Sequence, residues 1–180
     1  MANKLDKIIV IDVEATCWKD KIPLGYVNEI IEVGIVVLNL GTMETSEFSY
    51  LIQPKYSKIS EFCTELTGIK QEDVSSLGFF FSDFCDKVKK DIPHLKDYTW
   101  ASYGDYDRRQ FEKDCQLWNI PYIFGRTHLN IKNFFALKKL HPREVGMSKA
   151  LNILGLKLKG KHHKALDDAR NITRILKEIL

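Results

Sequence analysis

Residues 8–18 read IIVIDVEATCW, and this stretch decides the fold. It begins with a run of β-branched residues, which is typical of a strand buried on both faces of a sheet. Two carboxylates, Asp12 and Glu14, then interrupt the run. Because side chains two residues apart on a strand point to the same side, these two acids are expected to project together.

This pair of like charges needs a physical explanation. If both acids were desolvated without a partner, their repulsion would cost several kcal/mol. A hard divalent cation, Mg²⁺ or Mn²⁺, would offset that cost, since these ions prefer oxygen ligands. Alternatively, the strand ends here and the two acids are solvated. The stretch by itself is compatible with both interpretations.

The composition is that of an ordinary globular protein, with 180 residues, 44% hydrophobic content and a net charge of +3. This mildly basic balance permits an anionic partner. The cysteines have no C-x-x-C spacing, which argues against a structural zinc site and favours free thiols in a reducing compartment. No signal-peptide pattern and no apolar run near the ~18 residues of a membrane span is present, so we expect a cytoplasmic protein without a membrane partner.

The remaining hydrophobic patterns alternate between strand and helix periods. Further strands are predicted over residues 30–38, 44–52, 98–102 and 127–131. Helices are predicted over residues 79–90, 107–118, 132–140, 148–154 and 164–180, after a short helix capped by Ser60. Strands that come first and then alternate with helices predict an α/β fold with a mixed sheet, in a single domain over residues 1–180.

The closing helix contains two adjacent acids that helical spacing separates. Asp168 shares the apolar, core-facing side of the helix with Ala165, Ile172, Ile175 and Ile179. Asp167 shares the polar side with Arg170, Asn171 and Arg174. Asp168 is therefore the candidate metal ligand, whereas Asp167 is expected to form a surface salt bridge that contributes little to stability.

The same test applies to the helix over residues 107–118. Asp107 lies on one stripe with Phe111, Cys115 and Trp118, whereas Asp105 precedes the helix. Asp107 is therefore the second candidate ligand. Alternatively, Asp107 is a helix N-cap and Gln110 reaches back to it as in a capping box.

Two histidines, His162 and His163, stand immediately before the closing helix. Isolated, such a pair is usually a polar feature of a loop. The surrounding lysines at positions 157, 159, 161 and 164 place cations beside a site that otherwise collects carboxylates. Phosphate is the ligand that uses both, through a metal ion on one side and lysine on the other.

Three motifs in chain order resemble those of the DEDD exonucleases of the histidine subtype (DEDDh): Asp12-x-Glu14, Tyr106-Asp107 and His163-x-Ala165-x-x-Asp168. Residues 12–17, 29–34 and 62–69 also resemble the Eri-type branch, which includes RNA-trimming enzymes and bacterial proteins of the KapD type. The resemblance extends over residues 8–180. It implies an RNase H-like fold, with antiparallel opening strands, parallel strands and flanking helices.

The resemblance also implies an activity and a set of catalytic residues. The chain would be a metal-dependent 3′→5′ exonuclease that releases nucleoside 5′-monophosphates from RNA or single-stranded ends. Of two Mg²⁺ or Mn²⁺ ions, Asp12, Glu14 and Asp168 would hold the first, and Asp12 with Asp107 the second. His163 would act as the general base.

Four further residues are candidates for substrate contacts. Ala15 and Thr16, beside the acids, would touch the terminal sugar, and Trp18 and Leu66 would pack on the last base. Two alternatives remain open: a DNA-directed exonuclease of the proofreading type, and a non-catalytic regulatory or RNA-binding protein of the same fold. The sequence does not indicate a protein partner.

Overall fold

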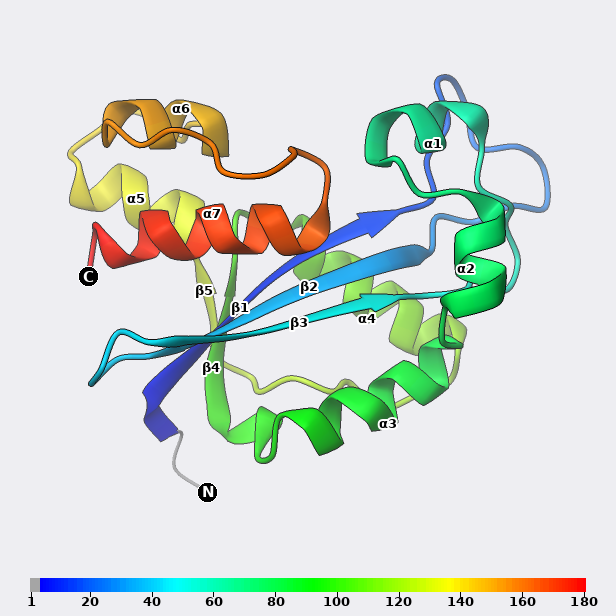
Figure 1. The fold of residues 1–180 in the computed structure, drawn as a ribbon, viewed down its shortest axis with the longest axis horizontal. Coiled ribbons are helices and arrows are strands. Elements are labelled where there is room, and N and C mark those ends of the chain that lie inside the picture. The colour runs from blue at the N-terminus through cyan, green and yellow to red at the C-terminus, as the bar shows by residue number, and fades with distance from the viewer. Residues whose placement is uncertain (1–3) are drawn as a thin grey trace.

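β1 (Lys4–Ala15) is the central strand of the sheet in the computed structural model, which describes residues 4–180 (Figure 1). Its antiparallel partner β2 (Ile30–Asn39) pairs in turn with β3 (Thr45–Leu51). On its other side, β1 pairs in parallel with β4 (Tyr98–Ser102), and β4 pairs in parallel with β5 (His128–Asn130). The order β3-β2-β1-β4-β5 confirms the predicted mixed sheet.

The helices follow the predicted order, with boundaries that differ by one to three residues. They are α3 (Phe81–Asp91), α4 (Tyr106–Leu117), α5 (Ile131–Lys138), α6 (Met147–Ile153) and α7 (Ala165–Lys177), with a 3₁₀ turn at Leu95–Asp97. None of the helices within residues 4–180 is long and apolar enough to cross a membrane.

Two short helices precede α3. Ser60 caps α1 (Glu61–Thr67) as predicted, because its hydroxyl accepts the N–H of Cys63. The sequence pattern does not predict α2 (Gln71–Leu77). This helix buries only Val74 among its residues, so it carries no apolar repeat from which a helix could be inferred.

The side chains of β1 alternate between two hydrophobic cores. Residues 9, 11 and 13 face the core under α3 and α4, whereas residues 8 and 10 face the core under α5, α6 and α7. Figure 1 shows α7 along one face of the sheet and α3 on the other. Asp12 and Glu14 continue the even-numbered series toward the α7 side. The interpretation that the strand ends before these acids is wrong, because β1 stays paired with β2 as far as Ala15.

The first turn of α7 lies directly on β2. A Cβ atom on Gly34 would be 2.2 Å from the carbonyl carbon of Ala165, so the helix approaches the strand where a side chain has no room. Next to it, the Glu32 carboxylate accepts the N–H of Ala165 at 3.0 Å and places a negative charge at the helix N-terminus. Because Gly34 is the cross-strand neighbour of Asp12, this contact sets the start of α7 beside the acids.

Gly34→Ala should lower the free energy of unfolding by about 1–3 kcal/mol, because the added methyl group must push the first turn of α7 off the sheet. Guanidinium unfolding followed by circular dichroism measures this change. Gly41→Ala is the matched control, since its Cβ would meet only Asn39 at an ordinary 3.4 Å. Equal stability of the two variants would contradict the close packing of α7 on β2.

Candidate active site

A cavity of about 520 Å³ lies where β1 passes the N-terminal end of α7. The four acids selected from the sequence all line it: Asp12, Glu14, Asp107 and Asp168. They come from β1, α4 and α7, which are far apart in the chain. The tertiary structure therefore brings these four carboxylates together.

Burial and mutual repulsion raise the pKa values of the two acids on β1. The pKa of Glu14 rises to about 8, first through burial and then through the charges of Asp168 and Glu32. The pKa of Asp12 is well above its usual range, through burial and then through Asp107 and Asp168. The site therefore disfavours its own negative charge and would favour a bound cation.

The backbone of β1 positions the side chain of Asp107, which lies in the first turn of α4. Its Oδ1 accepts the N–H of Val13 at 3.0 Å, beyond the point where β4 stops pairing with β1. Burial raises its pKa to about 6, although the hydrogen bond from Val13 opposes that shift. The capping-box interpretation is wrong, because α4 starts at Tyr106 and Gln110 donates to Asn28 and Asp114 instead.

Asp168 faces the cavity from the buried side of α7, as predicted. Its Oδ2 accepts the backbone N–H of His163 at 2.9 Å and the ring Nδ1–H of His162 at 2.7 Å. Its Oδ1 is buried and has no hydrogen-bond partner within residues 4–180. An unpaired buried carboxylate oxygen is costly, and this oxygen of Asp168 is free to accept a further ligand.

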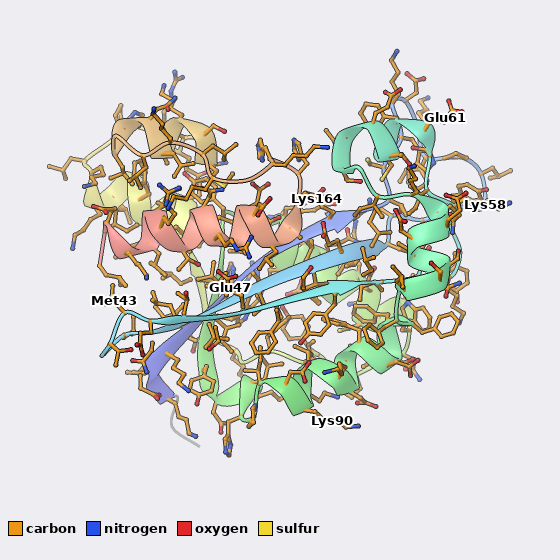
Figure 2. All side chains as sticks on the ribbon, in the orientation of Figure 1. Met43, Glu47, Lys58, Glu61, Lys90 and Lys164 are labelled. Carbon is orange, nitrogen blue, oxygen red and sulfur yellow. The ribbon has the colours of Figure 1, made fainter. Side chains whose placement is uncertain are left out.

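Asp167 lies on the outer side of α7. Its Oδ1 pairs with Arg170 at 2.8 Å, and Arg170 also pairs with Glu47 of β3, which Figure 2 shows below the helix. Its Oδ2 accepts the N–H of Lys161 at 2.9 Å. The predicted surface salt bridge is confirmed, and Asp167 also holds the loop before α7.

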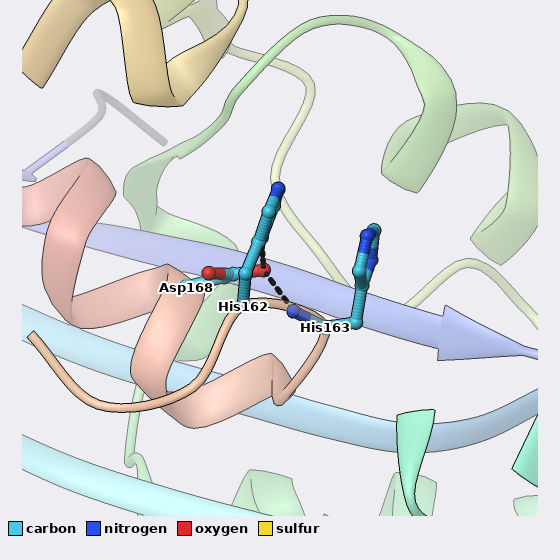
Figure 3. A group of neighbouring side chains, drawn as sticks. All are labelled: His162, His163 and Asp168. Atoms are coloured by element: carbon cyan, nitrogen blue, oxygen red, sulfur yellow. Dashed lines mark hydrogen bonds and ion pairs between the residues drawn. The ribbon is translucent and has the colours of Figure 1, made fainter. Parts of the chain in front are cut away.

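The two histidine rings stack nearly in parallel, with centroids 4.1 Å apart, and the His162 ring is the one beside Asp168 (Figure 3). His163 Nδ1 lies 3.8 Å from Glu14 Oε1, and the His163 side chain is 40% exposed. Burial and then the neighbouring His162 lower the pKa of His163, whereas Asp168 raises it. The His163–Asp168 pairing runs through the backbone N–H, and it is the His162 ring that touches the carboxylate.

The structure separates the four predicted substrate contacts into two groups. Ala15 and Leu66 line the cavity. Thr16 does not: its side chain is fully buried, and its hydroxyl donates to Val27 and accepts from the N–H of Glu29. Trp18 is outside the cavity lining too, where it packs at 6.0 Å from Tyr26. The expected contacts of Thr16 and Trp18 with the substrate are therefore not supported, because local packing and hydrogen bonds occupy both side chains.

Several residues of the site have no counterpart among the sequence predictions. His162, Tyr103, Tyr106 and Lys132 line the cavity, and Glu32 supports α7 from below. The pair of adjacent histidines was a usable sequence signal for His162. The Tyr106-Asp107 motif was a usable signal for Tyr106. No sequence signal marks Tyr103 or Lys132, because only the packing of α5 and of the β4–α4 turn brings them to the cavity.

The free oxygens of this acid cluster fit a hard divalent cation. Ligand oxygens of Asp12, Glu14 and Asp168 lie within 4.8 Å of one another. Asp168 Oδ1 has no hydrogen bond to compete with a metal ion. Carboxylate oxygens are the ligands that Mg²⁺ and Mn²⁺ prefer, so the donor set agrees with the charge balance of the site.

The model of the exonuclease family matches residues 9–176. The chain belongs to the exonuclease family. It is 33% identical over 184 residues to human 3'-5' exoribonuclease 1, which covers 97% of this chain and 52% of that protein. It is 32% identical over 178 residues to the probable 3'-5' exonuclease KapD of Bacillus subtilis (strain 168), which covers 96% of this chain and 83% of that protein. The chain thus spans about half the length of the human relative.

A solved structure has the same fold as this chain. The crystallographic structure of the nuclease domain of 3'hExo, a DEDDh family member bound to rAMP, superposes with a TM-score of 0.87 at 31% identity. The match covers 98% of this chain and 93% of that one. It confirms the RNase H-like fold and the resemblance to DEDDh enzymes, a family that is metal-dependent.

In metal-free protein at pH 8, Glu14→Gln should raise the free energy of unfolding by about 1–3 kcal/mol, because it removes a carboxylate that its neighbours repel. The pKa of Glu14 is raised, so the folded state binds the proton of the Glu14 carboxyl group more tightly than the unfolded state does. Wild-type stability should therefore fall as the pH rises from 4.5 to about 8.

Thermal unfolding in EDTA across that pH range measures both effects. Glu65→Gln, an exposed acid on α1, is the control and should change neither. A Glu14→Gln variant less stable than wild type at pH 8 in EDTA would show that protein contacts hold this charge favourably.

Proposed function

We propose that this chain is a metal-dependent 3′→5′ exonuclease that shortens RNA or other single-stranded 3′ ends and releases nucleoside 5′-monophosphates. The convergence of four carboxylates beside His163 in one cavity carries this proposal. The names of its relatives support RNA, and so does a 31%-identical structure that describes 3′-end-specific recognition of a histone mRNA stem-loop by a 3′-exonuclease. The four free cysteines suit a reducing cytoplasm.

The carboxylates would hold two ions of Mg²⁺ or Mn²⁺. Asp12, Glu14 and Asp168 would hold one, and Asp12 with Asp107 the other. When bound, these ions lower the pKa of the attacking water and stabilise charge on the leaving 3′ oxygen. Backbone N–H groups already fix Asp107 and Asp168, so both carboxylates are positioned in advance.

His163 would take the proton of the attacking water. Its lowered pKa keeps the ring neutral at pH 7, and the half-exposed side chain stands at the cavity beside Glu14. The water oxygen bonds to phosphorus, the P–O3′ bond of the penultimate nucleotide breaks, and the 3′ oxygen leaves as a hydroxyl after protonation by solvent. Glu14, at 3.8 Å, would stabilise the imidazolium that forms.

The rim of the cavity would position the terminal nucleotide. Ala15 and Leu66 line the cavity and would pack on its sugar and base. Lys161 lies in the loop before α7, and Lys164 lies at the start of α7 (Figure 2). Both place their ammonium groups within 3.8 Å of where a Cβ on Gly68 would stand. These cations therefore reach the C-terminal end of α1 across from α7, where they would meet a phosphate.

A labelled-oligomer assay tests the proposal. A 5′-labelled single-stranded RNA should shorten as a ladder with Mg²⁺ or Mn²⁺, EDTA should abolish this, and a 3′-phosphate should slow it. DNA of the same sequence tests the choice of sugar. Cleavage of a closed circular strand would indicate an endonuclease, and activity in excess chelator would contradict the role of the metal ions.

The adjacent acids should differ sharply in their effect on rate. Asp168→Asn and Asp107→Asn should each lower kcat by at least about 10²-fold, because each removes a proposed metal ligand. Asp167→Asn and Asp105→Asn are the matched controls, and their kcat should stay within a few-fold of wild type. Neither residue lines the cavity that contains the four carboxylates, which we call the acidic cavity. Single-turnover hydrolysis of labelled RNA measures these rates. An inactive Asp167→Asn variant that folds normally would contradict the assignment.

His163→Ala should lower kcat by about 10²–10⁴-fold while oligomer binding is retained, because only the general base is removed. His162→Ala should lose far less, since its ring contacts Asp168 rather than Glu14. Because the basic form of His163 is neutral and its pKa is lowered, the rate should rise with pH below 6.5. A pH–rate profile of both variants checks this, and near-normal turnover of His163→Ala would remove it from the mechanism.

A further inference from the structure

A second cavity, of about 450 Å³, lies between α4 and the segment that leads into β5. We call it the basic cavity, because its lining includes Lys96, Arg108, Arg126 and His128, with Glu112 as the one carboxylate among its described lining residues. Its floor is the stacked pair of Trp100 and Phe124, with ring centroids 5.0 Å apart. A cavity lined by charges of one sign raises the local concentration of ions of the opposite sign.

Two polar side-chain atoms of the basic cavity have no hydrogen-bond partner in the described part of the chain. Arg108 Nε and Tyr122 Oη are both buried, and neither has a hydrogen-bond partner within residues 4–180. The nearest carboxylate to the Arg108 guanidinium is Asp105, at 3.5 Å, which is longer than a strong charged hydrogen bond. In the described part of the chain, Lys96 and Arg126 form no ion pair. A buried donor without an acceptor is costly, and an anion bound beside Arg108 Nε would offset that cost.

His128 lies between two polar neighbours. Its Nε2 is 2.9 Å from the hydroxyl of Ser102, and its Nδ1 is 4.0 Å from Asp105. Burial and then the charge of Arg108 lower its pKa to about 4, whereas Asp105 raises it. The ring is therefore neutral at pH 7.

The first turn of α4 contributes one residue to each of the two cavities. Asp107 and Arg108 are neighbours in the first turn of α4, and the first lines the acidic cavity while the second lines the basic cavity. Ser102, at the end of β4, bonds His128 on one side and reaches Asp107 on the other. The two cavities are therefore lined by neighbouring residues of one helical turn.

We propose that the basic cavity binds a backbone phosphate of the substrate strand, upstream of the terminal nucleotide. The inference rests on the proposed function and adds a second anchor for the strand. The Arg108 guanidinium supplies the planar fork that matches phosphate oxygens. Trp100 and Phe124 are 1% and 4% exposed, so no base can stack on them, and the site contacts the backbone without reading sequence. A free mononucleotide carries the same phosphate, and the test separates the two sources.

Binding without hydrolysis tests the proposal on the full chain. Fluorescence anisotropy in Ca²⁺, which can neutralise the carboxylates, gives Kd for a single-stranded RNA of about twelve nucleotides and for a dinucleotide. Arg108→Gln and Arg126→Gln should each weaken the longer RNA roughly 3- to 10-fold and lower the slope of log K against log salt by about 0.7. Both should bind the dinucleotide like wild type.

Arg109→Gln is the matched control, because Arg109 is exposed on the same turn of α4 and lies outside the basic cavity. It should keep wild-type affinity and salt slope. If Arg108→Gln fails to fold, as judged by circular dichroism, the exposed Arg126 decides the matter alone. Unchanged affinity and slope in Arg126→Gln would overturn the proposal even if the chain degrades RNA. Equal loss for adenosine 5′-monophosphate used as a competitor would instead assign the cavity to a mononucleotide and overturn the strand path.

Discussion

The rest of the structure depends on the contact between the first turn of α7 and β2. Gly34 leaves room for the backbone of Ala165, and Glu32 accepts its N–H, so the helix starts at one place on the sheet. Asp168 lies in that same first turn, and Asp12 is the cross-strand neighbour of Gly34. One close backbone approach therefore sets both the packing of a core helix and the spacing of two carboxylates.

The buried acids of this protein fall into two groups according to their hydrogen bonds. Glu29 accepts three backbone N–H groups, from Lys55, Tyr56 and Ser57, and so holds the loop before α1. Asp168 instead keeps one buried oxygen without a partner in the described part of the chain. Acids whose oxygens are all hydrogen-bonded stabilise the fold. An acid with an unpaired oxygen, beside neighbouring acids whose pKa values are raised, destabilises the fold until a cation binds. This difference separates structural carboxylates from those suited to chemistry.

α4 separates two cavities of opposite charge. Its first turn presents Asp107 to the acidic cavity and Arg108 to the basic cavity, and the N–H of Val13 fixes the position of that turn against β1. A nuclease needs both kinds of surface, because carboxylates that hold metal ions repel the same phosphates that the enzyme must bind. Placing a cation one residue away from Asp107, a proposed metal ligand, would offset that repulsion without neutralising the acids directly.

The sequence by itself determined the strands, the longer helices and the four acids, because local periodicity shows which side chain of a helix or strand is buried. Asp168 could be chosen over Asp167 for this reason alone. It did not reveal α2, where no apolar repeat exists, or the burial of Thr16, whose hydroxyl accepts the N–H of Glu29, thirteen residues further along the chain. Only the tertiary structure placed the His162 ring on Asp168 and gathered the basic cavity around Arg108, because these contacts join segments whose meeting depends on how the helices pack on the sheet.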